Sequence, residues 1–141
     1  MKYLHTMVRV KNIDESLDFY CNKLGLKEIR RRVDENGKYT LIFLGAENSD
    51  NNFGLLELTY NWDSEDYTGG RNFGHLAYSV SNIYETCNTL MQNGVTINRP
   101  PRDGHMAFIK SPDGISIEIL QEGDSLPLQE PWKSMENKGS W

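Results

Sequence analysis

Two histidines and two glutamates stand at matching places in the sequence and could together bind a metal ion. His5 and His75 lie 70 residues apart in strand-like runs, and Glu57 and Glu118 each interrupt a later apolar run. In a strand, the apolar neighbours of such a glutamate point to the opposite face of the sheet. A carboxylate on the inner face of a sheet is unfavourable unless it is paired or bound to a metal. The sequence therefore predicts a site of two imidazoles and two carboxylates.

The residue types limit which metal such a site would hold. Imidazole and carboxylate ligands suit Ni(II), Co(II), Zn(II) or Fe(II) rather than metals that prefer thiolates. His105, beside an Asp-Gly turn, is expected to be an exposed loop residue. Arg9 follows His5 by four positions on the same strand face, where its guanidinium could pair with a carboxylate or hold an anion.

An internal repeat positions the four candidate ligands. The run 5–16 and the run 75–86 share histidine, valine, asparagine, isoleucine and glutamate at a constant offset of 70. Each predicted helix opens with an asparagine, carries glutamate three residues later and ends near a glycine, as helices often do. A repeat of this kind indicates two copies of one supersecondary unit.

Each copy is predicted to run strand, helix, strand, strand, strand. The first has a helix at 13–24, a turn at Asn36-Gly37 and strands at 3–10, 27–33, 38–44 and 54–60. The second has a helix at 83–93 and strands at 73–80, 95–99, 105–110 and 115–120. The predicted fold is α+β, with two tandem βαβββ modules whose curved mixed sheets enclose the metal. The chain divides into modules 1–60 and 73–121, a linker 61–72, and a tail 122–141 expected to be loose or draped over a partner.

Composition excludes several classes of protein. The 141-residue chain has a net charge of −5, which argues against a nucleic-acid partner. It has no apolar run near the ~18 residues of a membrane span, and its first residues lack a signal-peptide core. Cys21 and Cys87 fall on apolar helical stripes and are expected in the core, while Arg30–Arg32 resembles a solvated strand end. We therefore expect a cytoplasmic protein.

Several stretches of the chain resemble glyoxalase I, the lactoylglutathione lyase family of the vicinal oxygen chelate superfamily. The resemblance covers about residues 3–121 and is carried by the stretches 4–10, 16–20, 56–62, 73–75 and 112–118. It implies that the metal ligands are His5, Glu57, His75 and Glu118. It also implies a homodimer with two sites at the subunit interface, each taking the first histidine and glutamate from one chain and the second pair from the other.

The resemblance also implies substrate contacts. Arg9 and Asn61 correspond to contacts with the γ-glutamyl end of glutathione, and Arg71 to a contact with its glycyl carboxylate. The segments 47–53 and 102–105 are shorter than in many members, and the lysine that many members place in the second is absent. Short forms resemble the class activated by Ni(II) or Co(II) rather than Zn(II), and the group that holds the glycyl end stays open.

The implied reaction converts the hemithioacetal of methylglyoxal and glutathione to S-D-lactoylglutathione, which detoxifies methylglyoxal. Glu118 would remove the C1 proton, and Glu57 would return it at C2 or act on the opposite enantiomer, while one divalent metal per site stabilises the enediolate as a Lewis acid. No organic cofactor is implied. The alternatives are a same-fold extradiol dioxygenase or thiol transferase, a metal-free drug-binding protein, and a glyoxalase that uses another thiol such as trypanothione. Glu57 as a fourth ligand argues against the first alternative.

Overall fold

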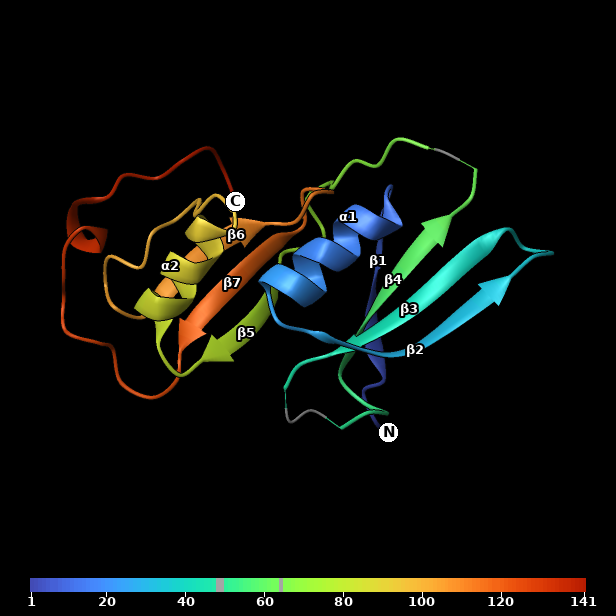
Figure 1. Cartoon of the computed structure of the whole chain (residues 1–141), viewed down its shortest axis with the longest axis horizontal. Coiled ribbons are helices and arrows are strands. Elements are labelled where there is room, and N and C mark those ends of the chain that lie inside the picture. The colour runs from blue at the N-terminus through green and yellow to red at the C-terminus, as the bar shows by residue number, and fades with distance from the viewer. Residues whose placement is uncertain (48–49, 64) are drawn as a thin grey trace. The chain divides into compact units, whose positions relative to one another are not determined.

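The computed structural model describes residues 1–47, 50–63 and 65–141, which form two compact units, Met1–Thr68 and Gly69–Trp141 (Figure 1). The division between the units falls inside the segment 61–72. Parts of that segment and of the loop 47–53 lie outside the described residues. Within the described chain, no helix has the length and apolar character to cross a membrane.

The first unit has the predicted order of elements. It consists of β1 (His5–Arg9), α1 (Ile13–Leu17), the π-helix η1 (Asp18–Lys23), β2 (Lys27–Asp34), β3 (Tyr39–Gly45) and β4 (Leu55–Asn61). The strand order is β1-β4-β3-β2, with β1 and β4 parallel and the other pairs antiparallel. The sheet is therefore mixed, as expected.

The second unit repeats this arrangement with one strand shortened. It contains β5 (Leu76–Val80), α2 (Ile83–Gln92), β6 (Met106–Lys110), β7 (Ser116–Gln121) and the short 3-10 helix η2 (Trp132–Ser134). The strand order is β5-β7-β6, with β5 and β7 parallel. The strand predicted at 95–99 is reduced to a bridge between Arg99 and Phe108. Pro100 and Pro101 follow directly and lack the N–H groups that would extend the ladder.

Both helices begin where the sequence predicts, whereas the first helix is less regular than predicted. The side-chain oxygens of Asn12 and Asn82 each accept two backbone N–H groups of the first helical turn, at 3.0–3.2 Å. The first helix does not run regularly to residue 24, because it widens into the π-helix at Asp18. In the wider turn the adjacent residues Phe19 and Tyr20 are both buried, while Leu17 is only half-buried.

The two cysteines are free thiols. Cys87 is fully buried, and burial raises the pKa of its thiol to about 12. Cys21 is half-buried, and its pKa is raised by burial and by the charge of Glu28. Both therefore stay protonated near neutral pH and are poor nucleophiles, consistent with the predicted core role.

The hairpin predicted at Asn36-Gly37 joins β2 to β3, with a wider turn than the two-residue form. Asp34 pairs with Tyr39 across the last rung, so four residues form the loop. The Gly37 N–H donates to Asp34 Oδ1 at 2.8 Å, and the positive φ of 52° belongs to Lys38.

The tail is packed on the second unit, so the expectation of a loose end is wrong. Residues 122–141, which we call the C-terminal strap, run past α2 and end beside β6 (Figure 1). The indole of Trp132, 1% exposed, stacks on the ring of Tyr84 in α2 at 6.3 Å. Leu126 N–H donates to the Gly104 carbonyl at 3.0 Å, where a Cβ on Gly104 would overlap the Leu126 backbone. These apolar and backbone contacts make the strap part of the second unit.

We predict that Trp132→Ala lowers the free energy of unfolding by about 3–5 kcal/mol, because it opens a cavity where a fully buried indole packs on α2. Urea denaturation followed by circular dichroism measures this loss. The matched control is Leu128→Ala, in the same strap but 59% exposed, which should change stability by less than about 0.5 kcal/mol. Equal effects of the two substitutions would mean that the strap does not support the unit.

Candidate metal centre

The first predicted ligand pair comes together on one sheet face of the first unit. His5 on β1 and Glu57 on the neighbouring β4 have their Nε2 and Oε2 atoms 3.0 Å apart. The register pairs His5 with Leu55, two positions before Glu57, so the period-two alternation of both strands gives the two side chains a common face. Glu57 is 8% exposed, and the imidazole is the polar partner that a buried carboxylate requires.

The second predicted pair repeats this geometry in the second unit. His75, one residue before β5, and Glu118 on β7 have Nε2 and Oε2 3.2 Å apart. Leu76 pairs with Ile117 in a parallel register, as β1 pairs with β4 in the first unit. The repeat seen in the sequence is therefore also a structural repeat, with one His–Glu pair in each unit.

A phenylalanine supports each imidazole. The ring of His5 packs edge-to-face on Phe43 at 5.7 Å, and that of His75 packs edge-to-face on Phe108 at 5.4 Å. The two phenylalanines occupy equivalent places, because each stands directly opposite the glutamate of its pair in the antiparallel register. Sequence reasoning missed both, since only the strand register places them beside the histidines. Such ring pairs contribute about 0.5–1.5 kcal/mol each and fix the ring planes.

The two pairs differ in how the carboxylate is held. Thr59 Oγ1 donates to Glu57 Oε1 at 3.2 Å, and both groups are buried. The equivalent station in β7, two residues after Glu118, is Leu120, which has no donor. A carboxylate bound by a neighbouring donor keeps a more constant orientation. Thr59 could have been found from the sequence, because it lies two positions after Glu57 on the same face.

The donor set fits a divalent metal of borderline hardness. Each unit offers one imidazole nitrogen and one carboxylate oxygen facing each other, with an aromatic ring beside the imidazole and, for Glu57, a hydroxyl donor behind the carboxylate. Within either unit, the described residues contain no group of three or more histidine, cysteine, aspartate or glutamate side chains that could hold an ion. Each unit therefore supplies two of the four predicted ligands.

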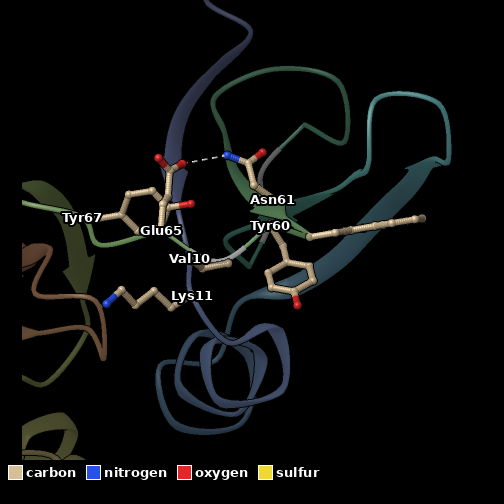
Figure 2. A pocket seen from close by; sticks show the side chains of 7 residues that line it. Val10, Lys11, Tyr60, Asn61, Glu65 and Tyr67 are labelled. Carbon is tan, nitrogen blue, oxygen red and sulfur yellow. Dashed lines mark hydrogen bonds between the residues drawn. The ribbon is translucent and has the colours of Figure 1, made fainter.

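A small pocket lies in the first unit, near the ends of β1 and β4. Arg9 and Asn61 each follow a predicted ligand by four residues on the same strand, about 13 Å further along the same face. Asn61 lines the pocket, and its Nδ2 donates to Glu65 Oε1 at 3.2 Å (Figure 2). The other lining residues are Val10, Lys11, Tyr60, Trp62 and Tyr67.

The charges around this pocket are mixed. Burial, together with the hydrogen bond and charge of Glu65, raises the pKa of Tyr67, while Asn61 and the charge of Arg9 act in the opposite direction. Lys11 makes an ion pair with Asp66. The pocket therefore presents an amide, a carboxylate and a phenol close to the positive charge of Arg9, a combination suited to a zwitterionic group.

The remaining predicted residues lie in the second unit. Arg71 is exposed, four residues before His75. Arg102 Nη1 donates to Met135 O at 2.9 Å and to Asn137 Oδ1 at 2.8 Å, so it anchors the strap. His105 is not the exposed residue that was expected, because it is half-buried with its Nδ1 inside the protein.

Comparison with known proteins agrees with this geometry. The family model of the glyoxalase/bleomycin resistance protein/dioxygenase superfamily matches residues 2–119. The lactoylglutathione lyase of Neisseria meningitidis serogroup A is 42% identical, covering 86% of this chain and 91% of the relative. That of Escherichia coli O157:H7 is 39% identical over 89% and 96% of the two chains.

A solved structure is also similar. The trypanothione-dependent glyoxalase I of Leishmania major matches with a TM-score of 0.77 and 38% sequence identity, covering 86% of each chain. Two matched His–Glu pairs on repeated mixed sheets, a family match over most of the chain, and relatives near 40% identity agree with one another. The chain therefore belongs to the glyoxalase/bleomycin resistance protein/dioxygenase superfamily and, within it, to the lactoylglutathione lyases.

Proposed function

We propose that the chain isomerises the hemithioacetal of methylglyoxal and glutathione to S-D-lactoylglutathione. The observation that carries this assignment is the pair of His–Glu contacts, 3.0 and 3.2 Å, at equivalent places in the two units. Relatives named lactoylglutathione lyase share about two-fifths of their residues with the chain over most of their length. The chain is accordingly a metal-dependent lyase, and reaction of the purified protein with the preformed hemithioacetal, followed by thioester absorbance, tests it.

We propose His5, Glu57, His75 and Glu118 as the metal ligands. Two neutral imidazoles and two negatively charged carboxylates bind a divalent ion well. We propose Ni(II) or Co(II) as the bound metal in preference to Zn(II). When bound, the metal supplies Lewis acidity that stabilises negative charge on the two oxygens of the substrate. Reconstitution of apo-protein with Ni(II), Co(II), Zn(II) and Mn(II) separates the candidate metals.

The two carboxylates have different proposed roles in proton transfer. Glu118 takes the C1 proton. The residue two positions later in β7 is Leu120, which has no hydroxyl group to hold the carboxylate, so the side chain of Glu118 is free to turn toward a substrate. Glu57, whose Oε1 accepts from Thr59, keeps a fixed orientation from which it returns the proton at C2. The net change moves the C1 proton to C2, by way of the two carboxylates, and the hydroxyl proton from the C1 oxygen to the C2 oxygen, with no oxidant or reductant.

We propose a homodimer in which each complete site takes one His–Glu pair from each subunit. Each unit holds only two of the four ligands, and a two-fold dimer would bring first-unit and second-unit pairs together twice. Cytoplasmic location is proposed on the two free thiols, which fit a reducing compartment.

The proposed substrate contacts lie on both units. Arg9 and Asn61 would hold the γ-glutamyl end, with Glu65 available for its ammonium group, and Arg71 would approach the glycyl carboxylate. Trypanothione remains the alternative thiol, since a structure 38% identical to this chain is described as trypanothione-dependent. Methylglyoxal assayed with glutathione and with trypanothione decides between the two.

We predict that Glu57→Gln and Glu118→Gln each leave the protein folded and reduce activity by at least about 100-fold, because each removes a ligand and a proton carrier. Metal content after dialysis and thioester formation are the two measurements. Glu122→Gln, an exposed position just after β7, serves as the matched control and should retain both. Wild-type rate and metal content in Glu57→Gln would contradict the four-ligand site.

The second prediction concerns assembly. Mixing His5→Ala with His75→Ala homodimers should restore activity, because one of the two sites in each heterodimer then has all four ligands. Random exchange makes half the molecules heterodimers, so recovery should approach about a quarter of the wild-type rate. Native mass spectrometry verifies the exchange. Complete exchange without recovery would place the whole site within one chain.

The third prediction concerns Arg9. Arg9→Lys keeps the charge but loses the bidentate fork, so we expect mainly a higher KM for the adduct. A charge-assisted hydrogen bond is worth about 1.5–3 kcal/mol, which corresponds to roughly 10- to 150-fold in kcat/KM. Arg32→Lys, at the exposed hairpin beside Asp34, is the control. A fall in metal affinity with unchanged KM at saturating metal would assign Arg9 to the metal site instead.

A further inference from the structure

The phenylalanine beside each imidazole is itself covered on one face. In the first unit, Arg30 on β2 pairs in register with Phe43, and its guanidinium carbon lies 4.0 Å from the ring centroid. This cation–π contact backs the ring on which His5 packs. Arg30, Phe43 and His5 thus form a continuous row, joined by two contacts, that leads to a proposed ligand.

The equivalent arginine in the second unit has other partners. Arg99 pairs with Phe108 across the isolated bridge, as Arg30 pairs with Phe43. Its guanidinium, however, is held by Asp103 Oδ2 at 2.8 Å and by the carbonyl of Met106. Asp103 also accepts the backbone N–H groups of His105 and Met106, so this arrangement belongs to the turn before β6.

The final residue of the chain covers Phe108. The indole of Trp141 stacks on the Phe108 ring with a centroid distance of 6.1 Å and an interplanar angle of 28°. Phe108 in turn packs edge-to-face on His75 at 5.4 Å. The match to the family model ends at residue 119, so the strap that brings this indole to Phe108 lies beyond the residues of that match.

The strap is anchored close to its end. Asn98 Nδ2 donates to the backbone carbonyl of Lys138 at 2.8 Å, and the backbone carbonyl of Asn98 accepts the Lys138 N–H at 2.8 Å. Arg102 holds the carbonyl of Met135 and the side chain of Asn137. Only two residues separate the Lys138 anchor from Trp141, which restricts where the indole can lie.

We propose that Trp141 is a positioning residue for the second ligand pair: by stacking on Phe108 it fixes the ring against which the imidazole of His75 rests. It supplies in the second unit the support that Arg30 supplies in the first. The inference rests on the proposed role of His75 as a metal ligand. Its consequence is that the C-terminal strap contributes to metal affinity without contributing a ligand.

The test is titration of metal-free protein with Ni(II) by calorimetry. Trp141→Ala should weaken metal binding roughly threefold to tenfold, below the 10- to 100-fold loss typical of a missing hydrogen-bonded partner, because the support acts through a ring. Trp141→Phe keeps an aromatic face and should bind within about twofold of wild type. Leu128→Ala, an exposed change in the same strap, is the control and should leave affinity unchanged.

A second readout follows the imidazole directly. Nuclear magnetic resonance of the histidine side chains in metal-free protein should show the His75 ring signals shifted and broadened in Trp141→Ala and restored in Trp141→Phe, with His5 signals unchanged. Trp141 is 41% exposed, so we expect Trp141→Ala to fold, and Trp141→Leu keeps an apolar side chain over Phe108 if the alanine variant does not fold.

The outcomes separate the two proposals. If His75→Ala fails to weaken Ni(II) binding, the proposed metal site is wrong. If His75→Ala weakens binding while Trp141→Ala matches wild type in both affinity and His75 signals, the site stands and the positioning role is overturned. A raised KM in Trp141→Ala with unchanged metal affinity would also overturn it, and would assign the indole to substrate contact.

Discussion

The structure is organised around two carboxylates placed on the inner face of a sheet. Glu57 and Glu118 lie in strands whose neighbouring residues are apolar and point the other way, so each carboxylate lies on the face opposite to its apolar neighbours. Burial of such a group is unfavourable without a partner, and in each unit the partner is a histidine on the adjacent parallel strand. Removal of either histidine would take away the partner that its carboxylate has on the adjacent strand, which ties the fold to the site.

The parallel pairing explains why one short module can build half of a metal site. A parallel neighbour requires a crossover, and the capped helix that follows each first strand provides it. The crossover places the first and last strands of a module side by side, so residues far apart in sequence share a face. The antiparallel strand next to the glutamate then adds the phenylalanine that orients the imidazole.

The two modules have diverged around this common plan. The carboxylate of the first is held by Thr59, and its phenylalanine is covered by Arg30. The second has a leucine at the threonine station, and its phenylalanine is covered by Trp141. A fixed carboxylate in one half and a freer one in the other suits a reaction in which one group abstracts a proton and the other returns it. Divergence of the supports, with the His–Glu pair retained in each module, is therefore consistent with the proposed division of roles.

The sequence by itself determined the repeat, the helix caps, the hairpin and the pairing of histidine with glutamate, because these depend on local propensity and on the period-two alternation of strands. It also carried enough identity to known lyases to establish the family. Tertiary structure alone decided the rest. The rings of Phe43 and Phe108 reach the histidines only through strand register, and the strand expected at 95–99 was shortened by the two prolines after it. The sequence of the strap has no hydrophobic periodicity from which its structure could be predicted. Its conformation is fixed by individual contacts with residues distant in sequence, such as that of Trp132 with Tyr84.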